Sequence, residues 1–261
     1  MALDRRHFTR LALAFAAASR IEPLSAAQHD PKLQFGPPEP FSHDILIAKA
    51  QKLAQSPYQA PPRPDPAIVQ QIDYDAHGKL RYRKEAALWA DGPSPYPVTF
   101  QHVGRYFPKT VKMHRVLGQS AREILYDPAY FMGGPDHVAA RLASTPSAFA
   151  GFWVQEDRAR TIRDKSSGQR KSWKEREPWA TFLGASYFRA VGELGQVGLS
   201  ARAVALGPGT AQPEEFPDFT AFWFEPARSP DDPAIVHALL DGPSLTGAYR
   251  FALSRGKGVV M

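Results

Sequence analysis

Short apolar runs separated by turn residues dominate the chain from Leu80 onward. The runs are rich in Val, Phe, Tyr, Trp and Ala, and Gly, Pro or Asp bounds most of them. This pattern predicts strands, and the 25 prolines argue against a helical bundle because proline cannot continue a helix. The predicted strands are 80–83, 98–103, 111–117, 149–155, 180–190, 199–206, 220–225, 234–240 and 246–254. Nine short strands with turns between them predict an all-β fold, an antiparallel β-sandwich.

One short helix is expected before the strands. Ser42 can cap its N-terminus, and Phe41 and Leu46 occupy the two positions of a hydrophobic staple. The Ser56-Pro57 pair ends it, because the residue before a proline avoids the helical conformation. Its apolar positions, which fall mostly on one side, are Ile45, Leu46, Ala50, Leu53 and Ala54.

The N-terminus has the layout of a twin-arginine signal peptide. Arg5 and Arg6 precede an apolar run from Leu11 to Ala18 that is too short to span a bilayer. Small residues follow, and we place the cleavage after Ala27. The alternative, an amphipathic helix that opens a cytosolic domain, would need a polar face that this run lacks. We therefore expect export to the periplasm and no stable membrane anchor.

These features predict three parts of the chain. Residues 1–27 are the signal peptide, the polar and proline-rich residues 28–40 are a flexible lead-in, and residues 41–261 are the sandwich. Two predicted loops, 119–148 and 156–178, are longer than hairpins need, and long loops on a β scaffold often carry function.

Composition excludes several kinds of chemistry. There is no cysteine, and the eight histidines include no pair at zinc-ligand spacing, so we expect no disulfide and no metal or other cofactor. The formal charge of +6 falls to +4 without residues 1–27, which carry four Arg against Asp4 and Glu22. Most of the excess lies in residues 157–177, with eight Lys or Arg against four acids. This is too local for a dedicated nucleic-acid surface.

Aromatic side chains recur through the predicted strands and suit the apolar faces of sugar rings. Tyr187 and Arg189 alternate on one strand and so share a face. With Trp223 and Tyr249 they are the predicted substrate-binding residues, although the same aromatics could fill the core instead. Carboxylates for glycoside chemistry are available at strand ends, but the catalytic pair stays unassigned. The candidates are Asp127, Glu214, Glu215, Glu225, Asp231, Asp232 and Asp241.

Long stretches of the sequence resemble the periplasmic glucan biosynthesis protein G/D family, and the paired arginines are more similar to its D members. The stretches with this likeness are AKAQKLAQSPYQAPP at 48–62, IDYDAHGKLRYRKEAALW at 72–89, REILYDPAYF at 122–131, FLGASYFRA at 182–190, GLSARAVAL at 198–206, EEFPDFTAFWFEPA at 214–227 and ALLDGPSLTGAYRF at 238–251. The likeness covers about Phe35 to the last residue but only the N-terminal part of the family.

The resemblance implies a role in making osmoregulated periplasmic glucans, whose backbone is β-1,2-linked glucose. It implies a large sandwich with a groove, a smaller immunoglobulin-like domain after it, and an endo-β-1,2-glucanase-like activity for D members. It also places the family's catalytic aspartates beyond Met261, so enzymatic activity of this chain stays open. The expected partner is β-1,2-glucan; the alternative is a non-catalytic glycan-binding or assembly module.

Two further expectations follow from the sequence. An incomplete sandwich would expose strand edges and apolar faces, which predicts self-association in sedimentation or pairing with a C-terminal half. The basic segment from Arg158 to Arg176 is either a solvated loop or a contact for anionic lipid or glycan. The second possibility predicts binding that weakens with salt.

Overall fold

The structure is a computed structural model that describes residues 32–142, 145–163, 168–184, 186–192, 198, 200–211, 213–256 and 259–260. The predicted signal peptide and its cleavage position after Ala27 lie outside these residues. Within the described part of the chain, no helix has the length and hydropathy that crossing a membrane requires.

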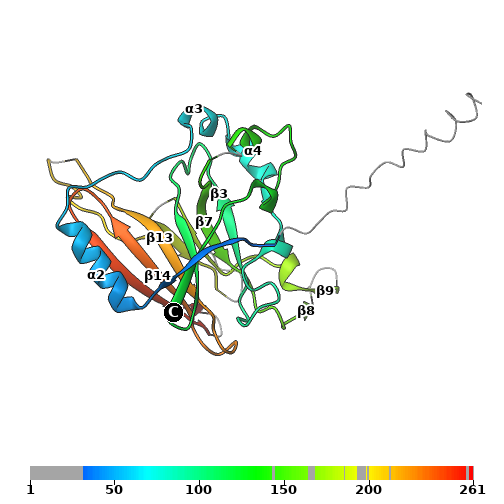
Figure 1. Ribbon diagram of the computed structural model, residues 1–261. Helices are drawn as coiled ribbons and strands as arrows, with labels where there is room; N and C mark the ends of the chain where they lie inside the picture. The colour runs from blue at the N-terminus through cyan, green and yellow to red at the C-terminus, as the bar shows by residue number, and fades with distance from the viewer. Residues whose placement is uncertain are drawn as a thin grey trace, which may run out of the picture. The chain divides into compact units, whose positions relative to one another are not determined.

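Two sheets face each other and form a sandwich (Figure 1). The first has six strands in the order β1 (Phe35–Pro40), β5 (Ser120–Ile124), β4 (Lys112–Leu117), β13 (Asp218–Glu225), β14 (Ala234–Asp241) and β15 (Thr246–Leu253). The second has five strands in the order β12 (Ala201–Arg202), β11 (Tyr187–Ala190), β10 (Ala180–Leu183), β7 (Phe149–Val154) and β3 (Val98–His102). All neighbours are antiparallel except β4 and β13, which run parallel.

Shorter elements connect and flank the sheets. The helices are α2 (His43–Ala54), α3 (Pro66–Val69) and α4 (Tyr74–Lys79), and the 3-10 turns are η1 (Lys84–Ala86), η2 (Pro128–Tyr130), η3 (Val138–Leu142) and η4 (Trp173–Glu175). Three two-stranded pairs join β2 (Arg81–Tyr82) with β6 (Phe131–Met132), β8 (Ile162–Arg163) with β9 (Arg170–Lys171), and β16 (Arg255–Gly256) with β17 (Val259–Val260).

Phenylalanine side chains fill the space between the sheets. Phe152 of β7 stacks on Phe182 of β10 with ring centres 4.7 Å apart. From the opposite sheet, Phe222 and Phe224 meet Phe152 edge-on at 4.9 and 4.7 Å. All four rings are buried, and such aromatic contacts add to the stabilisation from burial itself. This layer is the main core of the sandwich.

Helix α2 covers the face of the six-stranded sheet that points away from this core (Figure 1). The Ser42 hydroxyl accepts a hydrogen bond from the Ile45 backbone N–H at 3.2 Å, as a helix cap does. Phe41 stacks on Trp223 of β13 with ring centres 5.3 Å apart, and Leu46 and Ala50 are buried beside it. The predicted helix, its cap and its end are confirmed.

Eight of the nine predicted strands are present with small shifts at their ends, whereas the predicted strand 199–206 is reduced to the two residues of β12. One of the eight, 180–190, is a hairpin of two strands because the chain turns at Gly184, whose φ is +71°. Two other expectations need correction. Residues 35–40 of the predicted flexible lead-in form β1, paired with β5, and the predicted loop 119–148 contains β5 itself. Prolines at the outer strand of a sheet cost little because that strand has a free side.

Two buried histidines make the stability of this fold depend on pH. His102 and His114 are 2% and 9% exposed, and burial lowers the pKa of each from 6.5 to about 4. Unfolding exposes both rings to water, so the unfolded chain binds more protons between these two pKa values. The contribution of these two rings to stability is therefore present above pH 6.5 and is lost as the pH falls towards 4.

Between pH 7 and pH 4, we expect the free energy of unfolding of His114→Gln to fall by about 3 kcal/mol less than that of the wild-type chain. The measurement is the urea midpoint of both chains across that range. The difference between the chains at pH 7 to 9, where neither ring titrates, is the baseline. Parallel pH curves for the two chains would contradict the assignment of this proton to His114.

Candidate functional site

The five-stranded sheet turns one face away from the core, and its side chains form two rows across the strands. The first row consists of Thr99, Trp153, Thr181 and Arg189, each paired with the next on the neighbouring strand. The second row consists of Gln101, Gly151, Leu183, Tyr187 and Arg202. Because side chains alternate along a strand, both rows lie opposite the core phenylalanines. We call this surface the outer face.

A groove of about 740 Å³ opens over the β3, β7 and β10 part of the outer face. Its floor comes from the two rows, and its walls come from the segments 77–85, 107, 132 and 174–177. Both loops that the sequence singled out therefore contribute: Met132 from the first, and Lys174 and Glu177 from the second. The groove is built entirely from described residues.

Buried polar side chains form a hydrogen-bonded part of the floor. Thr99 and Gln101 are 1% and 4% exposed. The Gln155 side-chain amide donates to the Thr99 hydroxyl at 2.7 Å, and the Gln101 amide donates to the Thr181 hydroxyl at 3.1 Å. Buried polar groups need such partners, and here the partners fix the side chains in place. These hydrogen bonds make this part of the floor polar and rigid.

Trp153 supplies the apolar part of the floor. It is half-buried, whereas the other four tryptophans of the chain are 8% exposed or less. Leu183 and Phe107, also half-buried, line the same groove. Beside them, Gly151 of β7 has no side chain, and a Cβ there would collide with the Phe182 carbonyl oxygen. The result is an open surface with one large accessible ring.

Charged side chains stand around the groove and are mostly paired. Lys174 forms an ion pair with Glu85 at 2.8 Å between Nζ and Oε1, with both side chains 42% exposed. The hydrogen bond from Lys174 lowers the pKa of Glu85, so this carboxyl is ionised at neutral pH. Lys84 Nζ donates to the Lys174 carbonyl oxygen at 2.6 Å. Burial lowers the pKa of Lys84, an effect that the charge of Glu177 opposes.

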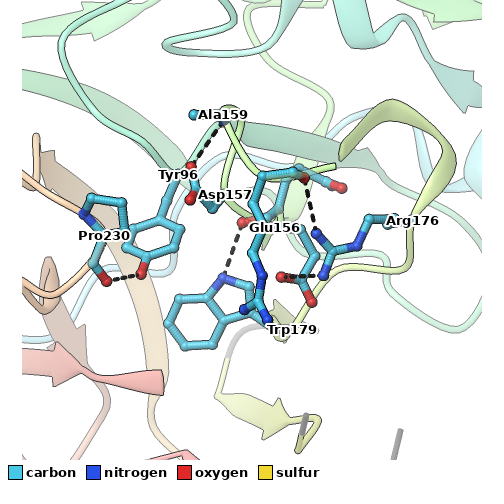
Figure 2. Close-up of polar contacts among 9 residues, drawn as sticks. Tyr96, Glu156, Asp157, Ala159, Arg176, Trp179 and Pro230 are labelled. Carbon is cyan, nitrogen blue, oxygen red and sulfur yellow. Dashed lines mark hydrogen bonds and ion pairs between the residues drawn. The ribbon is translucent and has the colours of Figure 1, made fainter. Parts of the chain in front are cut away.

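A buried ion pair holds the loop that carries this rim (Figure 2). Glu156 Oε2 and Arg176 Nη2 are 2.8 Å apart, and their side chains are 8% and 12% exposed. Next to them, the Trp179 indole N–H donates to the Gln155 carbonyl at 2.9 Å, and the Tyr96 hydroxyl donates to the Pro230 carbonyl at 2.5 Å. The ion pair and the Trp179 hydrogen bond thereby join the two ends of segment 156–178 to each other, close to Lys174 and Glu177.

A second cavity, of about 540 Å³, lies between the end of α2 and the β14–β15 turn. Tyr58, Asp241 and Ser244 are among its lining residues, and Asp241 is the one carboxylate among those described. Burial raises the pKa of Asp241. Glycoside cleavage needs two carboxylates, so this cavity has at most half of that machinery. No group of three or more side chains suited to a metal occurs in the part of the chain that the structure describes.

The four predicted binding residues fall into two groups. Tyr187 and Arg189 lie together on the outer face, one strand beyond the groove wall. Trp223 is 5% exposed under α2, on the other sheet, and Tyr249 of β15 packs inward against Phe219 and Phe251. Trp223 and Tyr249 take part in packing, and the structure does not bring them to the groove.

The sequence analysis did not select Trp153, Thr99 or Gln101. A signal was present, because in the strand 149–155 an inward Phe152 requires an outward Trp153. The polar floor could not be found this way. It depends on which strands are neighbours, and Thr99 and Gln155 are 56 residues apart in the sequence.

The fold and the groove define an all-β sandwich protein with an open site on one sheet face, lined by an accessible tryptophan and fixed polar groups. The family model described as "Periplasmic glucan biosynthesis protein, MdoG" matches residues 41–261. The chain belongs to this family, which is periplasmic and acts in glucan biosynthesis.

Curated relatives agree with this assignment. The chain is 44% identical over 261 residues to "Glucans biosynthesis protein D 2" of Ralstonia nicotianae, covering 99% of this chain and 47% of the relative. It is 38% identical over 263 residues to "Glucans biosynthesis protein D" of Xanthomonas campestris pv. campestris, with 99% and 46% covered. The protein of that name in Stenotrophomonas maltophilia is 38% identical over 264 residues, with 99% and 47% covered. The chain thus spans about half the length of these relatives.

The loop anchor leads to a prediction about stability. Arg176→Met removes the cation that lies 2.8 Å from the buried Glu156 carboxylate, and we expect it to lower the free energy of unfolding by about 3 kcal/mol. The double variant Arg176→Met with Glu156→Gln should recover much of this loss, since no buried charge is left unpaired. Urea unfolding of the three chains measures both values. A double variant that is no more stable than the single one would contradict a buried pair.

Proposed function

We propose that this chain binds the β-1,2-linked glucose backbone of periplasmic glucans in the groove on the outer face. The observation that carries the proposal is the position of Trp153, an accessible ring beside the fixed polar groups of Thr99 and Gln101. A glucose ring has C–H faces that stack on an aromatic ring and hydroxyls at its edge that need hydrogen-bonding partners. Membership of a glucan biosynthesis family supports this class of ligand.

For the whole protein we propose a D-type role that resembles an endo-β-1,2-glucanase. The names of the relatives support the D type. Hydrolysis requires one carboxyl that keeps its proton and a second that is ionised. Of the two described carboxylates that line the groove, Glu85 is held ionised by Lys174. Glu177 acts on the charge of Lys84, so both carboxylates are engaged with cations and suit the role of a protonated acid poorly. We therefore place the catalytic pair in the part of the relatives that this chain does not span. Export by the twin-arginine route remains part of this proposal.

The second candidate is a non-catalytic glycan-binding or assembly module in the periplasm. It is favoured by one observation: Glu85, one of the two described carboxylates that line the groove, is held ionised by Lys174, so the groove lacks a clear acid and base pair among the described residues. Such a groove can bind a glycan without cleaving it. Incubation of β-1,2-glucan with this chain joined to the C-terminal part of its relatives separates the two candidates, because only the first predicts shorter products.

Tryptophan fluorescence can test the groove directly. Because Trp153 is the accessible indole, β-1,2-glucan should change the emission of the wild-type chain. The emission of Trp153→Phe should stay nearly the same when glucan is added. Calorimetry should show that Trp153→Phe still binds, since a ring remains, and that Trp153→Ala binds about tenfold more weakly. If glucan changed the emission of Trp153→Phe as much as that of the wild-type chain, the glucan would bind at another place.

Salt dependence separates this proposal from an anionic partner. The glucose backbone is neutral, so a tenfold increase in NaCl should alter its affinity by less than about twofold, because screening acts on charges. An anionic glycan or lipid held by residues 158–176 should instead lose most of its affinity. Calorimetric titrations of both ligands at the two salt concentrations provide the comparison.

A further inference from the structure

The outer face continues beyond the groove to β11 and β12, where an arginine lies between two exposed aromatic rings. The Arg202 guanidinium is 4.3 Å from the centre of the Tyr187 ring and 3.7 Å from that of Phe216. Tyr187 and Phe216 are 43% and 36% exposed. A cation between two rings attracts both and limits their motion. We call Tyr187, Arg202 and Phe216 the aromatic stack.

The segment that carries Phe216 is tied to the sandwich. Leu206 and Glu215 exchange two backbone hydrogen bonds, at 2.9 and 3.1 Å. The Glu215 carboxylate accepts a hydrogen bond from the Ser244 backbone N–H at 3.0 Å. Phe216 therefore sits next to a fixed residue, and the stack is a preformed surface.

Strand pairing connects the aromatic stack with the groove. Leu183, which lines the groove, pairs with Tyr187, and Tyr187 pairs with Arg202. Neighbouring strands are about 4.8 Å apart, so Tyr187 on β11 lies about 5 Å across the sheet from Leu183 of the groove and about 10 Å from β7, the strand of Trp153. Beside Tyr187, Arg189 donates from Nε and Nη2 to the Ser200 hydroxyl at 3.1 and 2.7 Å. Ring surfaces and hydrogen-bonding groups thus continue along one face.

We propose that the aromatic stack is a second glycan subsite, which binds glucose units of the same β-1,2-glucan beyond those held in the groove. The inference rests on the proposed function and adds a property to it. A chain too short to reach from Trp153 to Tyr187 occupies the groove alone. A longer chain contacts both surfaces, so the protein selects for glucan length.

The chemistry of the stack favours a saccharide over a protein partner. Its apolar surface is limited to two rings, with Arg189 and Ser200 in the adjoining row. Protein interfaces have a larger continuous apolar centre, whereas a glycan needs isolated rings with hydrogen-bonding groups beside them. Because the aromatic stack lies next to the groove on the same face, the bound glucan would run across the strands rather than along them.

The test is calorimetry with β-1,2-linked glucose oligomers of increasing length, from the disaccharide upward, on the full chain. Trp153→Ala should weaken binding at every length. Tyr187→Ala should leave the disaccharide affinity unchanged and lower the affinity of long oligomers about fivefold to tenfold. Phe216→Ala should act in the same direction. Tyr74→Ala is the matched control, because Tyr74 is 80% exposed and lines neither surface.

The outcomes separate the two proposals. Binding that weakens with Trp153→Ala but not with Tyr187→Ala or Phe216→Ala at any length overturns the second subsite and keeps the groove. An equal loss for short and long oligomers in Tyr187→Ala also overturns it, since length would then have no part. If no oligomer of any length binds the wild-type chain, the proposed function fails together with the second subsite.

Discussion

The aromatic layer between the two sheets determines where every functional group lies. With Phe152 and Phe182 stacked inside, their neighbours Trp153, Thr181 and Leu183 must point outward. A shift of one residue in the register would bury Trp153 and expose the phenylalanines, at a large cost in apolar surface. The core therefore does more than stabilise the sandwich. It selects one register, and that register produces the two rows of the outer face.

The hydrophobic pattern predicts the parts of the fold in which burial repeats along the chain. The strands around Phe100, Phe152, Phe222 and Leu240 are such parts, because inward apolar residues recur there at every second position. It misses β1, with its three prolines, and β5, whose five residues include the adjacent charged pair Arg122 and Glu123. Both strands are specified by their partners rather than by their own composition, so no local pattern indicates them.

The candidate site is less predictable for a similar reason. Tyr187 and Arg189 could be placed on one face because they belong to one strand. Arg202 and Phe216 join Tyr187 only through the pairing of β11 with β12 and the turn that brings residue 216 back. The rim could be expected from the length of loop 156–178, but its position depends on the pair formed by Glu156 and Arg176. Long-range geometry supplies what local sequence cannot.

The parallel pairing of β4 with β13 has a consequence for the way the protein folds. The two strands join residues about a hundred positions apart, with most of the five-stranded sheet encoded between them. Hairpins such as β14–β15 close small loops and form early. The pairing of β4 with β13 instead requires the closure of a large loop. We therefore expect the protein to fold slowly, because β4 and β13 can pair only after this large loop closes. Without that pairing, β1, β5 and β4 are not joined to β13, β14 and β15.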